Sequence, residues 1–287
     1  MVARGAAAAP GAGTVLNALA TGVGSAFAID RTVQATVELA ESGPLDGRVA
    51  GDPDADTTLI ERCVERTVAE VAPARTAAGM VETESDLPMA GGLKSSSAAA
   101  NATVLATLDA LGAAEDVSRL AATRIGVAAA RDAGVTVTGA FDDATASMLG
   151  GLTVTDNTED ELLAHEPVDW AAAVWTPPER ARSAEADVER CRQVAPIADH
   201  VADLALAERY GTAMTVNGFA FCAALERPTE PLLEAMPAAT GVSLSGTGPS
   251  YVAVGDPDDI ETVLERWRGR PGTAWQTTTR IKGATTT

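Results

Sequence analysis

The sequence predicts an α+β protein of two domains, residues 1–155 and 156–287. The length of 287 residues suits two domains of ordinary size, and a hydrophobic content of 46% supports packed cores. Up to about residue 155, glycine-rich turns alternate with short strand-like segments and alanine-rich helical segments. Beyond that point, short apolar strands are separated by several helical segments. Such a mixture is typical of α+β folds.

The elements of the first domain follow from the spacing of apolar residues. Strands are predicted where β-branched and apolar residues form short runs or alternate with polar ones, over 15–20, 26–39, 80–87 and 152–155. Helices are predicted where apolar residues return every three or four positions, over 57–71, 96–111 and 117–133. Gly112 and Gly134 then end the last two helices. Glycine, proline and acidic residues over 41–47 predict a turn.

The second domain is predicted to combine short strands with further helices. The strands are expected where apolar or β-branched residues cluster, at 171–175, 242–244, 251–254 and 273–281. The helices are expected at 183–192, 196–210, 214–225 and 230–236. Glycines 246 and 248 lie between two of the strands and predict a turn there.

The charge balance excludes several classes of function. The chain has 40 acidic and 21 basic residues, a formal net charge of −19, and only two lysines, Lys94 and Lys282. Such a surface repels nucleic acid and anionic lipid, so we expect neither a nucleic-acid nor a membrane partner. Three widely spaced cysteines predict reduced core thiols and no zinc site: Cys63, Cys191 and Cys222. We therefore expect a salt-adapted cytoplasmic protein.

The most informative segment is a glycine turn at residues 91–92, followed by Lys94 and three serines at 95–97 before an alanine-rich helix. Glycines let a ligand approach the backbone, and the free amides at a helix N-terminus bind phosphate. A Walker A loop is excluded, because it needs glycine where this chain has Pro88 and Leu93. The segment therefore predicts a phosphate-binding loop of another kind. The alternative is a glycine turn that serves packing alone.

Three segments resemble the motifs of one kinase superfamily. Residues 88–99 resemble the central motif of the galactokinase, homoserine kinase, mevalonate kinase and phosphomevalonate kinase (GHMP) superfamily. Residues 139–147 resemble its catalytic aspartate segment, and residues 243–250 resemble its C-terminal glycine-rich motif. The resemblance implies a two-domain GHMP kinase fold, with an N-terminal nucleotide-binding α+β domain and a C-terminal ferredoxin-like α+β domain. Further segments resemble the archaeal shikimate kinases within this superfamily: 11–18, 21–27, 138–143 and 214–218.

The resemblance implies the cofactors ATP and Mg²⁺ and the substrate shikimate. The central motif would bind ATP through Pro88, Met89, Ala90, Gly91, Gly92, Leu93, Lys94, Ser95, Ser96, Ser97 and Ala98. The hydroxyl of Ser96 or Ser97 would ligate Mg²⁺, because oxygen ligands suit this ion. Asp132 is a candidate for the acidic metal ligand, from its spacing before the aspartate motif.

The paired aspartates are the predicted catalytic residues. By resemblance, Asp142 would contact the reacting hydroxyl as proton acceptor or orienting group, with Asp143 as the second candidate. The alternative for either residue is capping of a helix N-terminus. Mevalonate kinases carry a lysine near their N-terminus that supports the aspartate, and no lysine precedes Lys94 here. Lys94 is therefore expected to supply part of that charge near the phosphates; its alternative is a solvated loop lysine.

Substrate contacts are predicted less sharply. Asn17, Thr138 and Asn217 lie in the shikimate kinase-like segments and are candidates for hydroxyl contacts, with turn formation and helix capping as alternatives. The substrate carboxylate calls for an arginine, which the sequence does not identify. The predicted activity is ATP-dependent phosphorylation of shikimate in aromatic amino-acid synthesis. The alternatives are a homoserine or mevalonate kinase, or a nucleotide-binding regulator without turnover.

Overall fold

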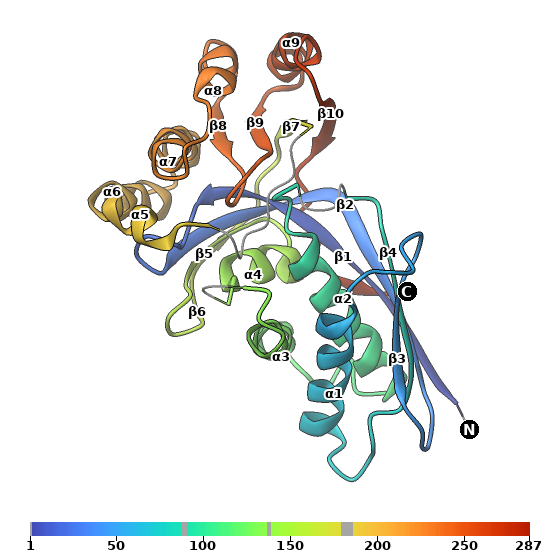
Figure 1. Ribbon diagram of the computed structural model, residues 1–287. Coiled ribbons are helices and arrows are strands. Elements are labelled where there is room, and N and C mark those ends of the chain that lie inside the picture. Colours follow the sequence, from blue (N-terminus) through green and yellow to red (C-terminus); the bar gives the residue numbers. More distant parts are fainter. Residues whose placement is uncertain (1, 88–90, 137–138, 179–185) are drawn as a thin grey trace.

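The computed structural model describes residues 2–87, 91–136, 139–178 and 186–287. Within these residues the strands form two separate sheets, and helices pack against both (Figure 1). The predicted α+β class is confirmed. No helix in the described part of the chain has the length and apolar character needed to cross a bilayer.

The first sheet is built around a long antiparallel hairpin of β1 and β2. Its strand order is β11-β1-β2-β4-β3, and β5 and β6 continue from the other half of β2. The strands are β1 (Ala3–Leu16), β2 (Val23–Leu39), β3 (Leu45–Val49), β4 (Gly79–Ser85), β5 (Leu152–Asp156), β6 (Glu161–Glu166) and β11 (Thr285–Thr286).

Small residues allow a helix to pack closely on this sheet. The helices of this part are α1 (Thr58–Val71), α2 (Ser95–Ala110), α3 (Arg119–Asp132) and α4 (Phe141–Leu149). Helix α2 contacts β1, β2, α1 and α3, and most of its residues are buried. A Cβ at Gly5 of β1 would lie 2.2 Å from the carbonyl oxygen of Ala106 in α2. Glycine at this position of β1 therefore lets the C-terminal end of α2 pack closely on the hairpin.

The second sheet has the ferredoxin-like arrangement that the resemblance implied. The chain passes through β7 (Ala171–Thr176), a group of helices, β8 (Gly241–Leu244), β9 (Tyr251–Gly255), α9 (Pro257–Arg268) and β10 (Thr273–Thr278). The antiparallel order in space is β10-β7-β9-β8, as in a β-α-β-β-α-β fold. The helices between β7 and β8 are α5 (Val188–Gln193), α6 (Ala195–Leu206), α7 (Tyr210–Ala224) and α8 (Glu230–Ala235).

Several predicted elements need correction. Residues 17–22 form a turn, so the strand predicted at 15–20 is the end of β1, whose alanine run resembles a helix in composition. The turn predicted at 41–47 gives way to β3 at residue 45. Helices α4 and α9 and strand β6 were not predicted, although proline and acids at the start of α9 and arginines at its end are ordinary helix signals.

The division at residues 155 and 156 stays a prediction. Around this position the chain runs along β5, turns, and pairs β6 with β5 in the first sheet. The end of the chain also returns to the first sheet, because β11 pairs with β1. Residues 156–287 are thus joined to residues 1–155 by strand pairing as well as by the peptide bond between residues 155 and 156.

Candidate active site

The glycine turn and the helix after it form an open helix N-terminus. Lys94 precedes α2 with φ 65° and ψ 30°, the left-handed conformation that few residues other than glycine adopt. Among the residues that the structure describes, no side chain caps this helix end. The first amides of α2 therefore keep their hydrogen-bonding capacity at the positive end of the helix dipole.

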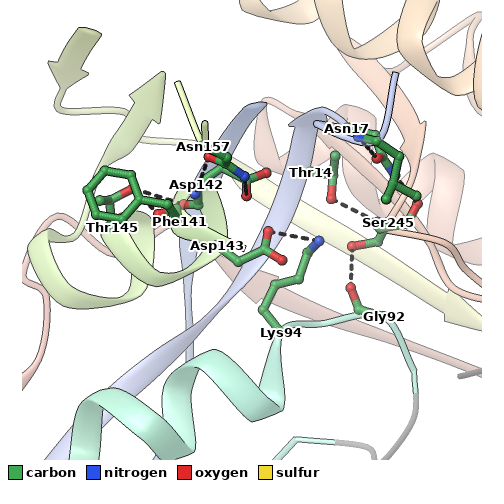
Figure 2. Close-up of polar contacts among 12 residues, drawn as sticks. Thr14, Asn17, Gly92, Lys94, Phe141, Asp142, Asp143, Thr145, Asn157 and Ser245 are labelled. Carbon is green, nitrogen blue, oxygen red and sulfur yellow. Dashed lines mark hydrogen bonds and ion pairs between the residues drawn. The ribbon is translucent and has the colours of Figure 1, made fainter. Parts of the chain in front are cut away.

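The side chain of Lys94 points toward α4 and pairs with Asp143. Its Nζ lies 2.9 Å from Oδ1 of Asp143, and the two side chains are 8% and 14% exposed (Figure 2). A Cβ at Gly246, in the loop between β8 and β9, would lie 3.0 Å from the same Nζ. Three motifs that are far apart in the sequence therefore meet at one ammonium group.

Asp142, one residue earlier on α4, points in a different direction, toward Gly24 of β2 and Asn157 after β5. Asn157, which follows β5, donates from Nδ2 to Oδ1 of Asp142 over 2.8 Å and accepts from the Asp142 amide over 3.0 Å. A Cβ at Gly24 would lie 2.5 Å from Oδ2 of Asp142, so this carboxyl packs directly on β2. Burial and the negative charge of Asp143 together raise the pKa of Asp142 to about 7, against the opposing effects of Lys94 and Asn157.

Hydrogen bonds fix the position of α4 relative to α2. Asn101 of α2 donates from Nδ2 to the carbonyl oxygen of Ala144 over 2.8 Å. Within α4, the hydroxyl of Thr145 donates to the carbonyl oxygens of Phe141 and Asp142. These contacts are buried, and they hold the helix start that carries both aspartates.

The loop at residues 245–250 packs on the glycine turn. The hydroxyl of Ser245 donates to the carbonyl oxygen of Gly92 over 2.8 Å, and the amide of Gly246 donates to Oγ1 of Thr14 over 2.8 Å. A Cβ at Gly92 would lie 2.4 Å from the carbonyl oxygen of Ser245, which only glycine permits. The two glycine-rich motifs thus contact each other directly, as Figure 2 shows for Ser245 and Gly92.

Asn17 and Asn217 lie at this junction but contact the protein itself. The Asn17 amide donates to Oδ1 of Asn217 over 2.9 Å, and Nδ2 of Asn17 donates to the carbonyl oxygen of Gly246 over 2.9 Å. Nδ2 of Asn217 donates to the hydroxyl of Ser243 over 2.9 Å. Asn17 also accepts from the amide of Leu19, which agrees with its turn-forming alternative. Asn217 lies inside α7, where it neither forms a turn nor caps a helix end. Contact of either residue with substrate stays a prediction.

Comparison with known proteins gives the family. Residues 58–151 match the model of the GHMP kinases N terminal domain. The chain is 64% identical over 285 residues to the shikimate kinase of Halobacterium salinarum, covering 99% of each chain. It is 46% identical over 288 residues to that of Methanosarcina mazei, covering 99% of this chain and 97% of the relative. The chain belongs to the archaeal shikimate kinase family.

Solved structures of the wider superfamily share the fold across the whole chain. A homoserine kinase from Cytophaga hutchinsonii superimposes with a TM-score of 0.75 at 16% identity, covering 99% of this chain and 98% of the other. The mevalonate kinase of Methanococcus jannaschii gives a TM-score of 0.74 at 12% identity, with 97% and 98% covered. The predicted GHMP kinase fold is therefore confirmed.

The remaining predicted site residues fall into three groups. Ser95, Ser96 and Ser97 form the first turn of α2, as expected, and Ala98 behind them is buried. Asp132 ends α3, where its carboxylate pairs with Arg66 over 2.6 Å and is 41% exposed. The described residues contain no cluster of three or more carboxylate, histidine or cysteine ligands. Four predicted residues lie outside the described residues: Pro88, Met89, Ala90 and Thr138.

Three site residues were not predicted: Thr14, Asn157 and Ser245. Thr14 and Ser245 lie in segments that the resemblance had singled out, so a role for each could have been proposed. Asn157 gave only a turn signal beside Asp156. Its contact with Asp142 depends on how β5 packs beside α4, which no local pattern in the sequence contains.

Proposed function

We propose that the protein is a shikimate kinase that transfers the γ-phosphate of ATP to the 3-hydroxyl of shikimate in aromatic amino-acid synthesis. The observation that carries this proposal is 64% identity to the Halobacterium salinarum shikimate kinase over 99% of both chains. The contact among the three GHMP motifs at Lys94 supports it. We place the activity in the cytoplasm, where ATP and the substrate are available.

The residues of the glycine turn and α2 fit the phosphates of ATP. No side chain of the described residues caps the N-terminal amides of α2, so these amides can donate to phosphate oxygens. Ser95, Ser96 and Ser97 add hydroxyl groups at the same helix end. When bound, ATP supplies the transferred phosphoryl group. The protein stabilises the negative charge of this phosphoryl group by positioning hydrogen-bond donors around it, and phosphoryl transfer requires little more from a protein.

Magnesium is the proposed metal. The residues that fit it are the serine hydroxyls at the N-terminal end of α2, because their oxygen atoms are suitable ligands. The hydroxyl of Ser96 or Ser97 would contribute one ligand, since Mg²⁺ at nucleotide sites takes its other ligands largely from phosphates and water. Asp132 would have to leave Arg66 to take part, because its carboxylate is engaged in that ion pair. When bound, Mg²⁺ neutralises phosphate charge.

We assign contact with the acceptor hydroxyl to Asp143, and thus reverse the order that the sequence favoured. The Asp143 carboxylate pairs with Lys94 beside the glycine turn, whereas both oxygens of Asp142 face Asn157 and Gly24. Asp143 would orient the hydroxyl or accept its proton as the phosphoryl group transfers. Lys94 would stabilise the carboxylate and the developing phosphate charge. Asp142 would hold the α4 turn in place.

A direct assay tests the function. ADP release is measured in high-KCl buffer with Mg²⁺-ATP and either shikimate, homoserine or mevalonate as acceptor. We expect turnover with shikimate and none above background with the other two. Turnover with homoserine or mevalonate alone would reject the proposed substrate. ATP binding without turnover on any of the three would favour a regulatory protein.

A further inference from the structure

Arg227 has a buried guanidinium nitrogen without a hydrogen-bond partner among the described residues. Its Nε is buried without a hydrogen-bond acceptor, and the residue takes part in none of the ion pairs among the described residues. The chain has 40 acidic residues against 21 basic ones, so protein carboxylates are plentiful. A buried guanidinium nitrogen without an acceptor costs free energy unless a ligand supplies one.

Arg227 lies beside the loop that contacts the catalytic ion pair. A Cβ at Gly248 would lie 3.5 Å from Nε of Arg227, and a Cβ at Gly246 would lie 3.0 Å from Nζ of Lys94. Glycine at both positions therefore lets the two cations approach one short loop, with the Leu244 side chain also packed beside Gly248. Arg119 also has a buried nitrogen without a partner among the described residues, but it begins α3, which follows the C-terminal end of α2, whereas Lys94 precedes the N-terminal end of α2.

The anion that Arg227 would bind differs from the nucleotide phosphates. Gly92 of the nucleotide-binding turn packs on the carbonyl oxygens of Ser245 and Gly248. The Nε of Arg227 instead lies 3.5 Å from the position that a Cβ of Gly248 would take, and the Cβ and the carbonyl of one residue point in different directions. The open end of α2 and Lys94 already suit the phosphates. A second, separate anion is left for Arg227.

We propose that Arg227 binds the carboxylate of the acceptor substrate and so determines which hydroxyl reaches Asp143. The planar guanidinium binds a carboxylate through two parallel hydrogen bonds, which a lysine cannot reproduce. Shikimate carries one carboxylate and three hydroxyls on a single ring. Holding the carboxylate in one place therefore determines which of the three hydroxyls lies beside Asp143. This inference rests on the proposed function.

Three variants and a modified substrate test the inference. Arg227→Ala is expected to raise KM for shikimate about 100-fold, with KM for ATP unchanged, because a charge-assisted bidentate contact is lost. Arg227→Lys should recover only part of that loss. Arg209→Ala is the matched control, since Arg209 is exposed and precedes α7, about 22 Å from its other end near Arg227. It should leave both constants unchanged.

The methyl ester of shikimate, which lacks the charge, separates a carboxylate contact from a structural role. The unmodified protein should use the ester with a KM about 100-fold above that for shikimate. Arg227→Ala should use both equally poorly. If the variant still discriminates between acid and ester, or if KM for ATP rises as much as KM for shikimate, the inference is wrong. Failure of the unmodified protein to phosphorylate shikimate would instead reject the proposed function.

Discussion

The first turn of α4 carries two neighbouring aspartates in different surroundings. On one side, Asp142 is 4% exposed, lies against Gly24 of β2, and is held by Asn157 through its amide and its carboxyl group. On the other, Asp143 faces Lys94 beside the two glycine-rich motifs. Successive residues of a helix point about 100° apart, so one turn presents its two carboxyl groups to two environments. Surroundings, more than residue type, separate a structural acid from a catalytic one.

Asp143→Asn tests the catalytic side and should have the largest effect. The amide cannot accept a proton or carry the charge that faces Lys94, so kcat should fall by about 1,000-fold. KM for ATP should change little. Steady-state kinetics with shikimate measure both constants. Asp142→Asn is the comparison variant and should keep kcat within about tenfold of the original. The opposite ranking of the two variants would return the catalytic role to Asp142.

Lys94→Met tests whether the cation contributes to turnover. Methionine keeps most of the side-chain length but leaves the Asp143 carboxylate without its partner, so kcat should fall by about 100-fold. Lys282→Met is a suitable control, because Lys282 is the other lysine of the chain and is exposed. Both rates are measured by ADP release at fixed high KCl. Equal rates for the original protein and Lys94→Met would show that Lys94 does not contribute to turnover.

The sequence predicted the site's polar residues better than their orientation. The resemblance identified Lys94 and both aspartates as candidates. The helix that carries the aspartates, α4, was not predicted, and Asp142, the aspartate that the sequence favoured, faces the sheet. The Asn157 contact depends on packing between β5 and α4, and the Arg227 position depends on how the 245–250 loop folds back. Periodicity finds elements, whereas these contacts arise from how distant elements pack.

Asp142→Asn tests the structural side through its pH dependence. The folded-state pKa of Asp142 is raised from 3.8 to about 7, so the folded protein binds its proton more tightly than the unfolded chain does. The resulting stability is full below pH 4 and is lost as pH rises to 7, above which the buried charge is destabilising. Asparagine stays neutral and can still accept from Asn157. The variant should therefore be more stable than the original at pH 8, by roughly 2 kcal/mol.

Thermal unfolding at pH 5.5 and pH 8.5 measures this effect. The gain in stability should be full at pH 8.5 and about half as large at pH 5.5, because at pH 5.5 the unfolded carboxyl is ionised whereas the folded one must bind a proton. Asp169→Asn, at an exposed position, should show no such difference. A gain that is equal at both pH values would mean that Asp142 is not the titrating group.

Ser245→Ala tests the contact between the two glycine-rich motifs and should have the smallest effect. The variant removes the bond from the Ser245 hydroxyl to the carbonyl oxygen of Gly92, which contributes about 1 kcal/mol at a buried site. The glycine turn would then be held less firmly, so KM for ATP should rise a few-fold while kcat stays close to its original value. Ser42→Ala, in the exposed turn before β3, should change neither constant. A large fall in kcat for Ser245→Ala would contradict this assignment. It would mean that the 245–250 loop takes part in the chemical step together with Asp143.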